Sequence, residues 1–223
     1  MLVKLFFASL PAIIFIVVFA LLDKKLIRKK WALLLAILVV GAIGSYICYR
    51  FEMHFGSYFK KVAVSTYLET LFYAIFGVAI FEEGYKWLVS LGAIFVDKKV
   101  KPRHILIYTV FASIGFAWFE NIVFYTFKYG IFSIVGRMFT AFPNHICNAI
   151  WMAYFLILFN KSKGKKKYLF LCLSLIVPTF IHGIYNSFLY QGDPTLMNYH
   201  AVYVLILYAV TALLIKKIIK ESK

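Results

Sequence analysis

The chain has 223 residues, of which 63% are hydrophobic and only 15% are charged, and its mean hydropathy is +0.84. A soluble globular domain is typically about 45–50% apolar, so this composition excludes that class and predicts a polytopic membrane protein in contact with the lipid bilayer. The net charge of +16 does not indicate nucleic-acid binding, because Lys and Arg stand in short clusters between apolar runs, where they set topology and contact anionic lipid.

A transmembrane helix needs about 20 apolar residues, and seven runs along the chain qualify. They are Leu2 to Leu22, Trp31 to Tyr49, part of Val62 to Val96, Ile105 to Phe127, Pro143 to Phe159, Tyr168 to Tyr190 and Ala201 to Ile215. No linker or internal repeat divides them. We therefore expect one all-α, multi-pass domain over residues 1–223, a bundle of about seven spans in the cell membrane.

Basic residues follow every second run, which predicts the orientation by the positive-inside rule. The clusters are Lys24, Lys25, Arg28, Lys29 and Lys30, then Lys98, Lys99, Lys101 and Arg103, then Lys161, Lys163, Lys165, Lys166 and Lys167, and finally Lys216, Lys217, Lys220 and Lys223. The connections between them carry fewer basic residues. The N-terminus is expected outside and the C-terminus in the cytosol.

Two stretches do not fit a simple span. As one helix, Val62 to Val96 would be about 51 Å long, which exceeds the bilayer core. Its polar first part is expected on the outer surface, with the span beginning near Leu71; the polar residues are Lys60, Lys61, Ser65, Thr66 and Glu69. Ile131 to Phe142 is too short to cross and is expected to form a surface or re-entrant helix.

A pair of carboxylates lies deep in the third span, in the sequence Phe81-Glu82-Glu83-Gly84-Tyr85-Lys86. An ionisable residue at this depth costs at least about 2.5–3.5 kcal/mol, so it persists only where something pairs with it or uses it. Lys86 follows Glu82 by four residues and Glu83 by three, and can neutralise either one. The two carboxylates point about 100° apart on a helix, so one is expected to enter the centre while the other braces a neighbouring helix.

Four helices are predicted to carry ionisable groups at one depth. Glu82, Glu120, His145 and His182 each lie about 21–24 Å from the cytosolic end of their helix at 1.5 Å per residue, which places them in the outer half of the bilayer. Asn186 follows His182 by one turn, Asn121 adjoins Glu120, and Arg137 precedes the fifth span. The sequence thus predicts a polar site facing the extracellular side.

Such a set suits hydrolysis. A carboxylate can take a proton from water, an imidazole can assist, and an amide can stabilise an oxyanion. Two histidines and a glutamate are also the ligands of many catalytic zinc sites, and His145, His182 and Glu120 are the candidates here, although an HExxH motif is absent. The residues alone do not distinguish a zinc enzyme from a metal-free glutamate mechanism. Each polar residue could instead be structural, as an ion pair or a hydrogen bond between helices.

Four motifs occur in an order that resembles a known family. Glu82-Glu83-x-x-Lys86 matches EExxK, Phe116-x-x-x-Glu120 matches FxxxE, and His182-x-x-x-Asn186 matches HxxxN; the fourth, Pro143-x-His145, lies with Arg137 between the last two. Over about residues 71–186 the chain resembles the PrsW membrane proteases, which are related to the CAAX-processing and bacteriocin-immunity glutamate proteases.

The resemblance implies a membrane endopeptidase that makes the site-1 cut in the extracellular part of a single-pass anti-sigma factor during the envelope-stress response. It implies catalytic roles for Glu82, Glu83, Glu120, His145 and His182, and an oxyanion role for Asn186, with Lys86, Asn121 and Arg137 in support. CAAX-type relatives have a His where this chain has Glu120, so their water-activating pair does not transfer directly. The alternative is a non-catalytic carrier, immunity or scaffold protein with a protease-like core.

Overall fold

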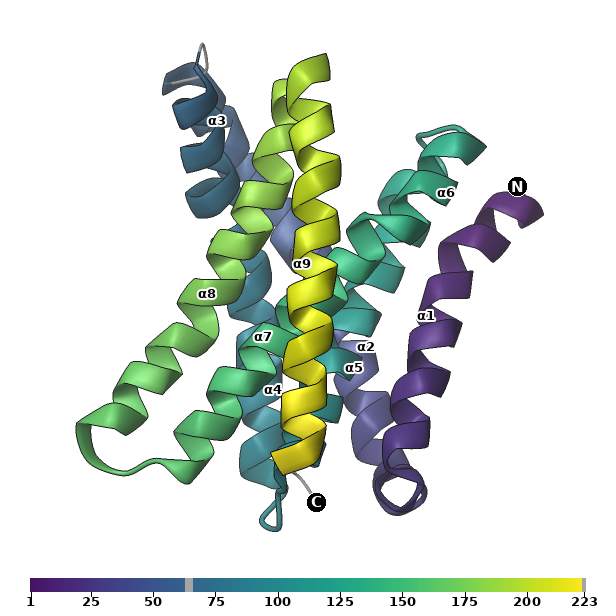
Figure 1. Ribbon diagram of the computed structural model, residues 1–223. Coiled ribbons are helices and arrows are strands. Elements are labelled where there is room, and N and C mark those ends of the chain that lie inside the picture. The colour runs from purple at the N-terminus through teal and green to yellow at the C-terminus, as the bar shows by residue number, and fades with distance from the viewer. Residues whose placement is uncertain (63–65, 222–223) are drawn as a thin grey trace.

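The computed structural model describes residues 1–62 and 66–221, with the side chains of residues 1–54 and 66–221. Every element in these ranges is helical, and Figure 1 shows the helices gathered in one bundle. In chain order they are α1 (Leu2–Leu22), α2 (Lys24–Val62), α3 (Tyr67–Phe72), η1 (Tyr73–Ala79), α4 (Ile80–Val96), α5 (Pro102–Phe119), η2 (Glu120–Tyr125), α6 (Ile131–Phe139), α7 (Ala141–Lys161), α8 (Gly164–Gln191) and α9 (Pro194–Glu221). The segments η1 and η2 are π-helical.

Six stretches of the described chain are long and apolar enough to cross a membrane. They are Leu2–Leu22, Lys24–His54, Pro102–Tyr125, Ile131–Lys161, Gly164–Gln191 and Pro194–Glu221. This confirms an all-α, multi-pass membrane protein. The remaining expected span lies in the helical run α3–η1–α4, which the π-helical segment divides, so that α4 itself has 17 residues. The expected count of seven therefore corresponds to these six stretches and the divided run.

The second helix differs most from the prediction. We expected a connection from Arg50 to Lys61, but the backbone of α2 stays helical to Val62, because no proline interrupts it. A kink at Lys30, with φ −125° and ψ 23°, separates its basic first turns from the apolar span. The prediction that Lys60, Lys61 and Ser65 lie on the outer surface falls outside the described side chains.

Two shorter elements refine the expected boundaries. Thr66 and Glu69 form a capping box at the start of α3, so this helix begins at Tyr67, before the expected start near Leu71. Ile131–Phe139 is a separate helix, α6, and a break at Thr140 divides it from α7. The expected short helix before the fifth span is therefore present, although α7 begins at Ala141, two residues before Pro143.

Helix α5 lies at the centre of the bundle. In its spanning window 78% of the residues are buried, against 22% for α1 and for α9. Two glycines permit the close contact between α2 and α5: a Cβ on Gly41 would collide with the carbonyl oxygen of Ala112, and one on Gly115 with that of Leu38. Small residues allow helix backbones to approach in this way in membrane proteins. The contact fixes α5 between α2 and α7, where Glu120 faces the site.

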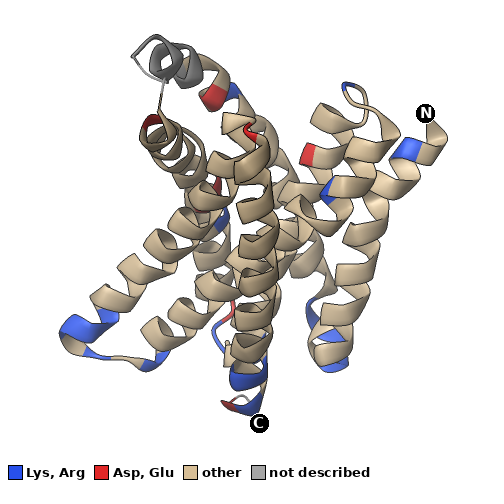
Figure 2. Cartoon of the chain, turned by 45° about the horizontal axis from the view of Figure 1, so that its top comes forward, with Lys and Arg blue, Asp and Glu red and all other residues tan. Residues whose placement is uncertain are grey.

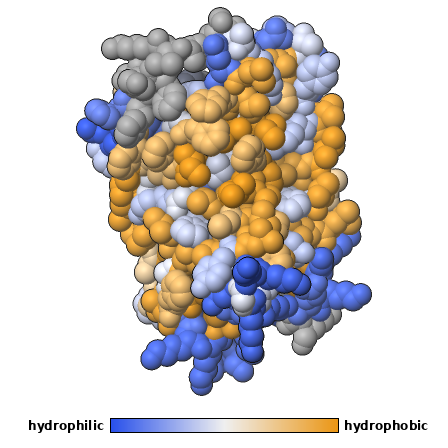
Figure 3. Space-filling view, turned by 90° about the vertical axis from the view of Figure 1, so that its left-hand side faces the viewer, coloured by the Kyte–Doolittle hydropathy of each residue, from blue (hydrophilic) through white to orange (hydrophobic). Residues whose placement is uncertain are grey.

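Charge and apolar surface are segregated along the bundle axis. Figure 2 shows Lys and Arg gathered at the end that carries the C-terminus and the α1–α2, α4–α5 and α7–α8 connections. Figure 3 shows apolar side chains across the middle of one face and hydrophilic ones at that same end. This is the asymmetry on which the predicted orientation rests.

Candidate active site

The residues of the candidate site are carried by helices whose geometry changes at the site. Glu82 and Glu83 lie in the first turn of α4, directly after the π-helical segment η1. Glu120 begins the second π-helical segment, η2, at the end of α5. Such segments are rare and occur frequently at functional sites. The hydrophobic pattern did not predict them, because it reports only the average helical period.

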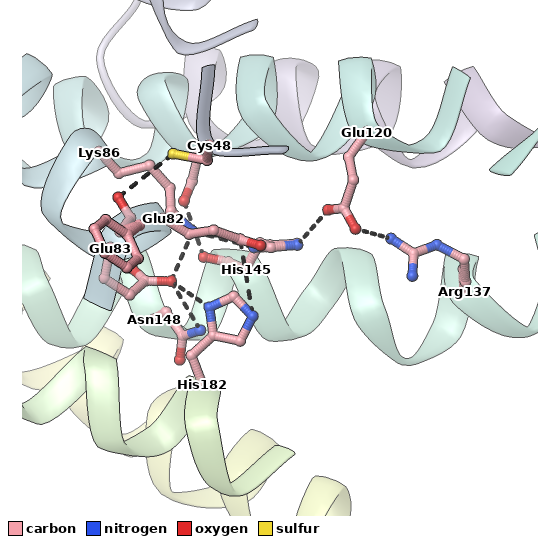
Figure 4. A network of polar contacts seen from close by, with 11 residues as sticks. Cys48, Glu82, Glu83, Lys86, Glu120, Arg137, His145, Asn148 and His182 are labelled. Carbon is pink, nitrogen blue, oxygen red and sulfur yellow. Dashed lines mark hydrogen bonds and ion pairs between the residues drawn. The ribbon is translucent and has the colours of Figure 1, made fainter. Parts of the chain in front are cut away.

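Glu83 joins three helices. Its Oε1 accepts hydrogen bonds from Lys86 Nζ at 2.6 Å, from His182 Nδ1 at 2.7 Å and from Asn148 Nδ2 at 3.4 Å (Figure 4). The side chain is 0% exposed. A buried carboxylate is stable only when it is paired and hydrogen-bonded, and Glu83 meets both conditions through Oε1, whereas its Oε2 is buried and has no hydrogen-bond partner within the described residues. Because His182 donates from Nδ1, its Nε2 carries the lone pair and is the nitrogen available for chemistry.

His145 connects Lys86 to Glu120. Lys86 Nζ lies 3.2 Å from Nδ1, and Glu120 Oε2 lies 2.9 Å from Nε2. An ammonium group has only protons to give, so Nδ1 accepts and the Nε2–H donates to Glu120, which assigns one neutral tautomer to the imidazole. The rings of His145 and His182 are 5.1 Å apart and nearly perpendicular. The two histidines are therefore oriented by different carboxylates within one cluster.

Arg137 holds Glu120 from the other side. Its Nη2 donates to Glu120 Oε1 and its Nε to Asn121 Oδ1, both at 2.8 Å. Its guanidinium also lies 3.4 Å from the centre of the Tyr125 ring. Arginine suits such a position because its planar group can stack and donate in several directions at once. Arg137 and Asn121 thus support Glu120, and the short helix α6 is fastened to η2.

Glu82 differs from Glu83 in facing a cavity. Its Oε2, like that of Glu83, is buried and has no hydrogen-bond partner within the described part of the chain, although His182 Nε2 lies 3.9 Å away and Lys86 Nζ 3.8 Å away. Glu82 lines an open cavity of about 530 Å³ together with Glu52 and Glu120. The wall includes the segment after η2, from Phe127 to Tyr129, so the cavity lies toward the end opposite the basic connections.

Glu52 is a site residue that the sequence did not indicate. It lies on α2 and lines the cavity together with Glu82. Two carboxyl groups at one site repel each other when both are ionised. The sequence did not predict Glu52 because the chain from Arg50 to Lys61 was expected to form a connection rather than a helix. On α2, Glu52 lies one turn after Cys48, whose Sγ contacts the carbonyl oxygen of Phe81 at 3.5 Å.

A metal ion would fit this cluster. One ligand atom each from Glu82, His145 and His182 lie within 4.8 Å of one another, and all three residues are buried. The unpartnered Glu82 Oε2 and the lone pair on His182 Nε2 are suitable ligand atoms, and the set of two histidines and a glutamate is typical of catalytic zinc. Both nitrogens of His145 already have neighbours, so binding a metal requires one of these contacts to be exchanged. The structure thus groups Glu82 with the histidines, while Glu120 contacts only His145 among the three.

Most of the predicted site residues lie in one connected network. The members in contact are Glu82, Glu83, Lys86, Glu120, Asn121, Arg137, His145 and His182. Asn186 lies one turn beyond His182 on α8 and is 8% exposed, and within the described chain it makes no hydrogen bond to the network. Its predicted oxyanion role therefore stays a prediction.

A bundle of membrane helices in which carboxylates and two oriented imidazoles meet beside an open cavity defines a membrane-embedded hydrolase. Comparison with known proteins identifies its family. The family model described as "PrsW family intramembrane metalloprotease" matches residues 29–214. The chain belongs to this family, and it is a membrane endopeptidase.

Curated relatives agree with this assignment. Protease PrsW of Clostridioides difficile is 27% identical over 205 residues, which cover 88% of this chain and 83% of the relative. Protease PrsW of Shouchella clausii is 28% identical over 165 residues, covering 73% and 72%. Protease PrsW of Oceanobacillus iheyensis is 33% identical over 121 residues, about half of each chain, with 52% and 54% covered. No solved structure matches the chain significantly.

Proposed function

We propose that the chain cuts the extracellular part of a single-pass membrane protein of the anti-sigma factor type, with Glu82 and His182 beside the reacting water. The observation that carries this proposal is the pair formed by Glu82 Oε2 and His182 Nε2, which lie 3.9 Å apart, with Glu82 lining the cavity. Glu82 Oε2 has no hydrogen-bond partner within the described residues, and His182 Nε2 presents a lone pair because Nδ1 donates to Glu83. They can therefore accept a proton from a water molecule between them.

The other residues position this pair. Glu83 fixes the tautomer of His182, Lys86 balances the charge of the two adjacent carboxylates, and Glu120 orients His145. Glu52, which lines the cavity with Glu82, is the carboxyl group placed to protonate the leaving amine. In this assignment Glu83 is a positioning residue and Glu82 the catalytic one.

Glu82, His145 and His182 are the residues that would hold a zinc ion. Such an ion polarises a carbonyl group and lowers the pKa of bound water to about 7. The protein's own contribution would be the orientation of both imidazoles by Glu83 and Glu120.

Co-expression with a tagged candidate anti-sigma factor tests the activity. The intact protein is expected to yield an extracellular fragment, and Glu82→Gln and His182→Ala to yield none at equal membrane levels. Glu221→Gln is the matched control, because this carboxylate pairs with Lys161 near the C-terminus and is 42% exposed. An unchanged fragment in both site variants would contradict the proposal and favour the carrier or scaffold alternative.

The metal is tested separately, by element analysis of the purified protein. We expect about one equivalent of zinc in the intact protein and in Glu221→Gln, and less in His182→Ala. An activity that persists after chelation, in protein shown to be free of zinc, would favour the metal-free glutamate mechanism.

A further inference from the structure

A second cavity, of about 500 Å³, lies at the basic end of the bundle. It is formed between the α1–α2 connection and the α4–α5 connection, where Figure 2 shows clustered Lys and Arg. Six lysines line it: Lys25, Lys29, Lys30, Lys98, Lys99 and Lys101. The catalytic cluster does not use these residues, and the cavity shares no lining residue with the active-site cavity.

The carboxylates in this cavity are already engaged. Asp97 accepts hydrogen bonds from Lys30 Nζ at 2.9 Å, from Tyr108 Oη at 2.7 Å and from His104 Nδ1 at 3.0 Å. Asp23 accepts one from the backbone N–H of Leu26 at 2.9 Å, as an N-cap. Of the six lysines only Lys30 forms an ion pair within the described residues. The other five lysines form no ion pair within the described residues, so the six lysines that line the cavity outnumber its two carboxylates, Asp23 and Asp97.

Two further features indicate what kind of anion would bind there. Helix α5 begins at this cavity, after Lys101, and no side chain caps it, so its amino end adds partial positive charge. Val96, which lines the cavity, and its neighbour Phe95 are 67% and 71% exposed. An anion bound in this cavity would therefore have apolar protein surface directly beside it. A lipid needs such a surface for its acyl chain, whereas a free phosphate does not.

We propose that this cavity binds the phosphate headgroup of an anionic phospholipid, with an acyl chain lying along Phe95 and Val96. Basic pockets between membrane helices recognise anionic headgroups by this combination of charge and adjacent apolar surface. The bound lipid would join the ends of α2, α4 and α5; α2 and α4 carry Glu52 and Glu82, and α5 leads directly into Glu120 at the start of η2. The proposal does not depend on the proposed substrate or on the mechanism of cleavage.

The α7–α8 connection offers a matched control within the same chain. It carries five lysines, of which Lys161 lies 3.7 Å from Glu221 and Lys167 lies over the ring of Phe159. The test compares Lys25→Gln/Lys29→Gln/Lys101→Gln with Lys163→Gln/Lys165→Gln/Lys166→Gln. Both triple variants lose three charges, so only the place of the charge differs.

Native mass spectrometry of the purified, detergent-solubilised full chain measures retention of phosphatidylglycerol, with phosphatidylcholine and inorganic phosphate as the other probes. We expect saturable binding of phosphatidylglycerol to the intact protein. The cavity variant should bind it at least tenfold more weakly, which corresponds to about 1.4 kcal/mol, and the control variant should bind it like the intact protein. Equal loss in both variants, or inorganic phosphate competing as well as the lipid, would overturn the proposal.

A measurement on the intact protein keeps the test informative if the cavity variant does not fold. A photoactivatable phosphatidylglycerol should label peptides from residues 23–30 and 95–104. Labelling that is as strong over residues 161–167 would show attraction to basic surface in general and would contradict a specific site.

Discussion

The bundle contains two clusters in which a buried carboxylate meets a lysine and a histidine, and they differ in one respect. At the basic end, both oxygens of Asp97 are satisfied: Oδ1 by Lys30 and the backbone of Lys99, and Oδ2 by His104 and Tyr108. In the site, Glu83 is held through Oε1 alone, and the Oε2 atoms of Glu83 and Glu82 have no hydrogen-bond partner within the described residues; of these two carboxylates, Glu82 is the one that lines a cavity.

This difference separates structural carboxylates from chemically available ones. A saturated carboxylate contributes stability, because removing it leaves several donors unsatisfied. An unsaturated one, desolvated and facing a cavity, can take up a proton or a cation. Composition is similar in the two clusters, so only the arrangement of partners distinguishes their roles.

The largest expected effect is on Glu82. Glu82→Gln should lower the cleavage rate by about 10²–10⁴-fold, the usual contribution of a general base, with little change in thermal stability. Asp97→Asn should instead lower thermal stability and leave the cleavage rate per folded molecule unchanged. Fragment yield and thermal unfolding are measured on the same purified samples. A Glu82→Gln protein that cleaves normally would remove the distinction between the clusters.

Breaking the pair within the site should destabilise the fold. Lys86→Met leaves the buried charge of Glu83 without its partner, a change that costs about 3–5 kcal/mol when one member of a buried pair is removed. Glu83→Gln combined with Lys86→Met removes both charges and should recover part of the lost stability without restoring cleavage. Thermal unfolding in detergent measures both. If the double variant is no more stable than Lys86→Met, the pair is not the source of the effect.

The cluster around Asp97 at the basic end of the bundle should make the stability of the fold depend on pH. Burial of Asp97 disfavours its charged form, but hydrogen bonds from Lys30, Tyr108 and His104 outweigh burial and hold the pKa of Asp97 well below its usual range. A lowered pKa in the folded state stabilises the fold above the ordinary value of about 3.9, and this stabilisation is lost as the pH falls below it.

Asp97→Asn should therefore lower stability at neutral pH by about 1.5–3 kcal/mol, the value of hydrogen bonds to a charged group. The difference from the intact protein should shrink as the buffer is made strongly acidic. Thermal unfolding of both proteins across this pH range provides the measurement. A difference that stays constant with pH would show that the charge of Asp97 is not involved.

The smallest expected effect is on Glu52, the second carboxyl group that lines the cavity with Glu82. Glu52→Gln keeps the shape of the side chain but removes the proposed proton donor, so cleavage should fall about tenfold, less than for Glu82→Gln. Its effect should also vary with pH, which a purely structural role would not produce. A pH profile of the cleavage rate that matches the intact protein would limit Glu52 to packing.

The sequence by itself determined the helical class, most of the membrane runs and most of the polar residues that meet in the candidate site. Apolar run length reports burial in the bilayer directly, and the spacing of Glu82, Glu83 and Lys86 follows from local helical geometry. That is why Lys86 lies within 4 Å of both carboxylates, as the spacing predicted.

Only the tertiary structure decided which hydrogen-bond partners each buried carboxylate has. The partners of Glu83 come from α7 and α8, 65 and 99 residues along the chain, and their approach depends on how these helices cross α4. The continuation of α2, which brings Glu52 to Glu82, and the π-helical segments before Glu82 and at Glu120 likewise depend on packing. Local sequence specifies the period of a helix, whereas the hydrogen bonds between helices depend on their positions in the bundle.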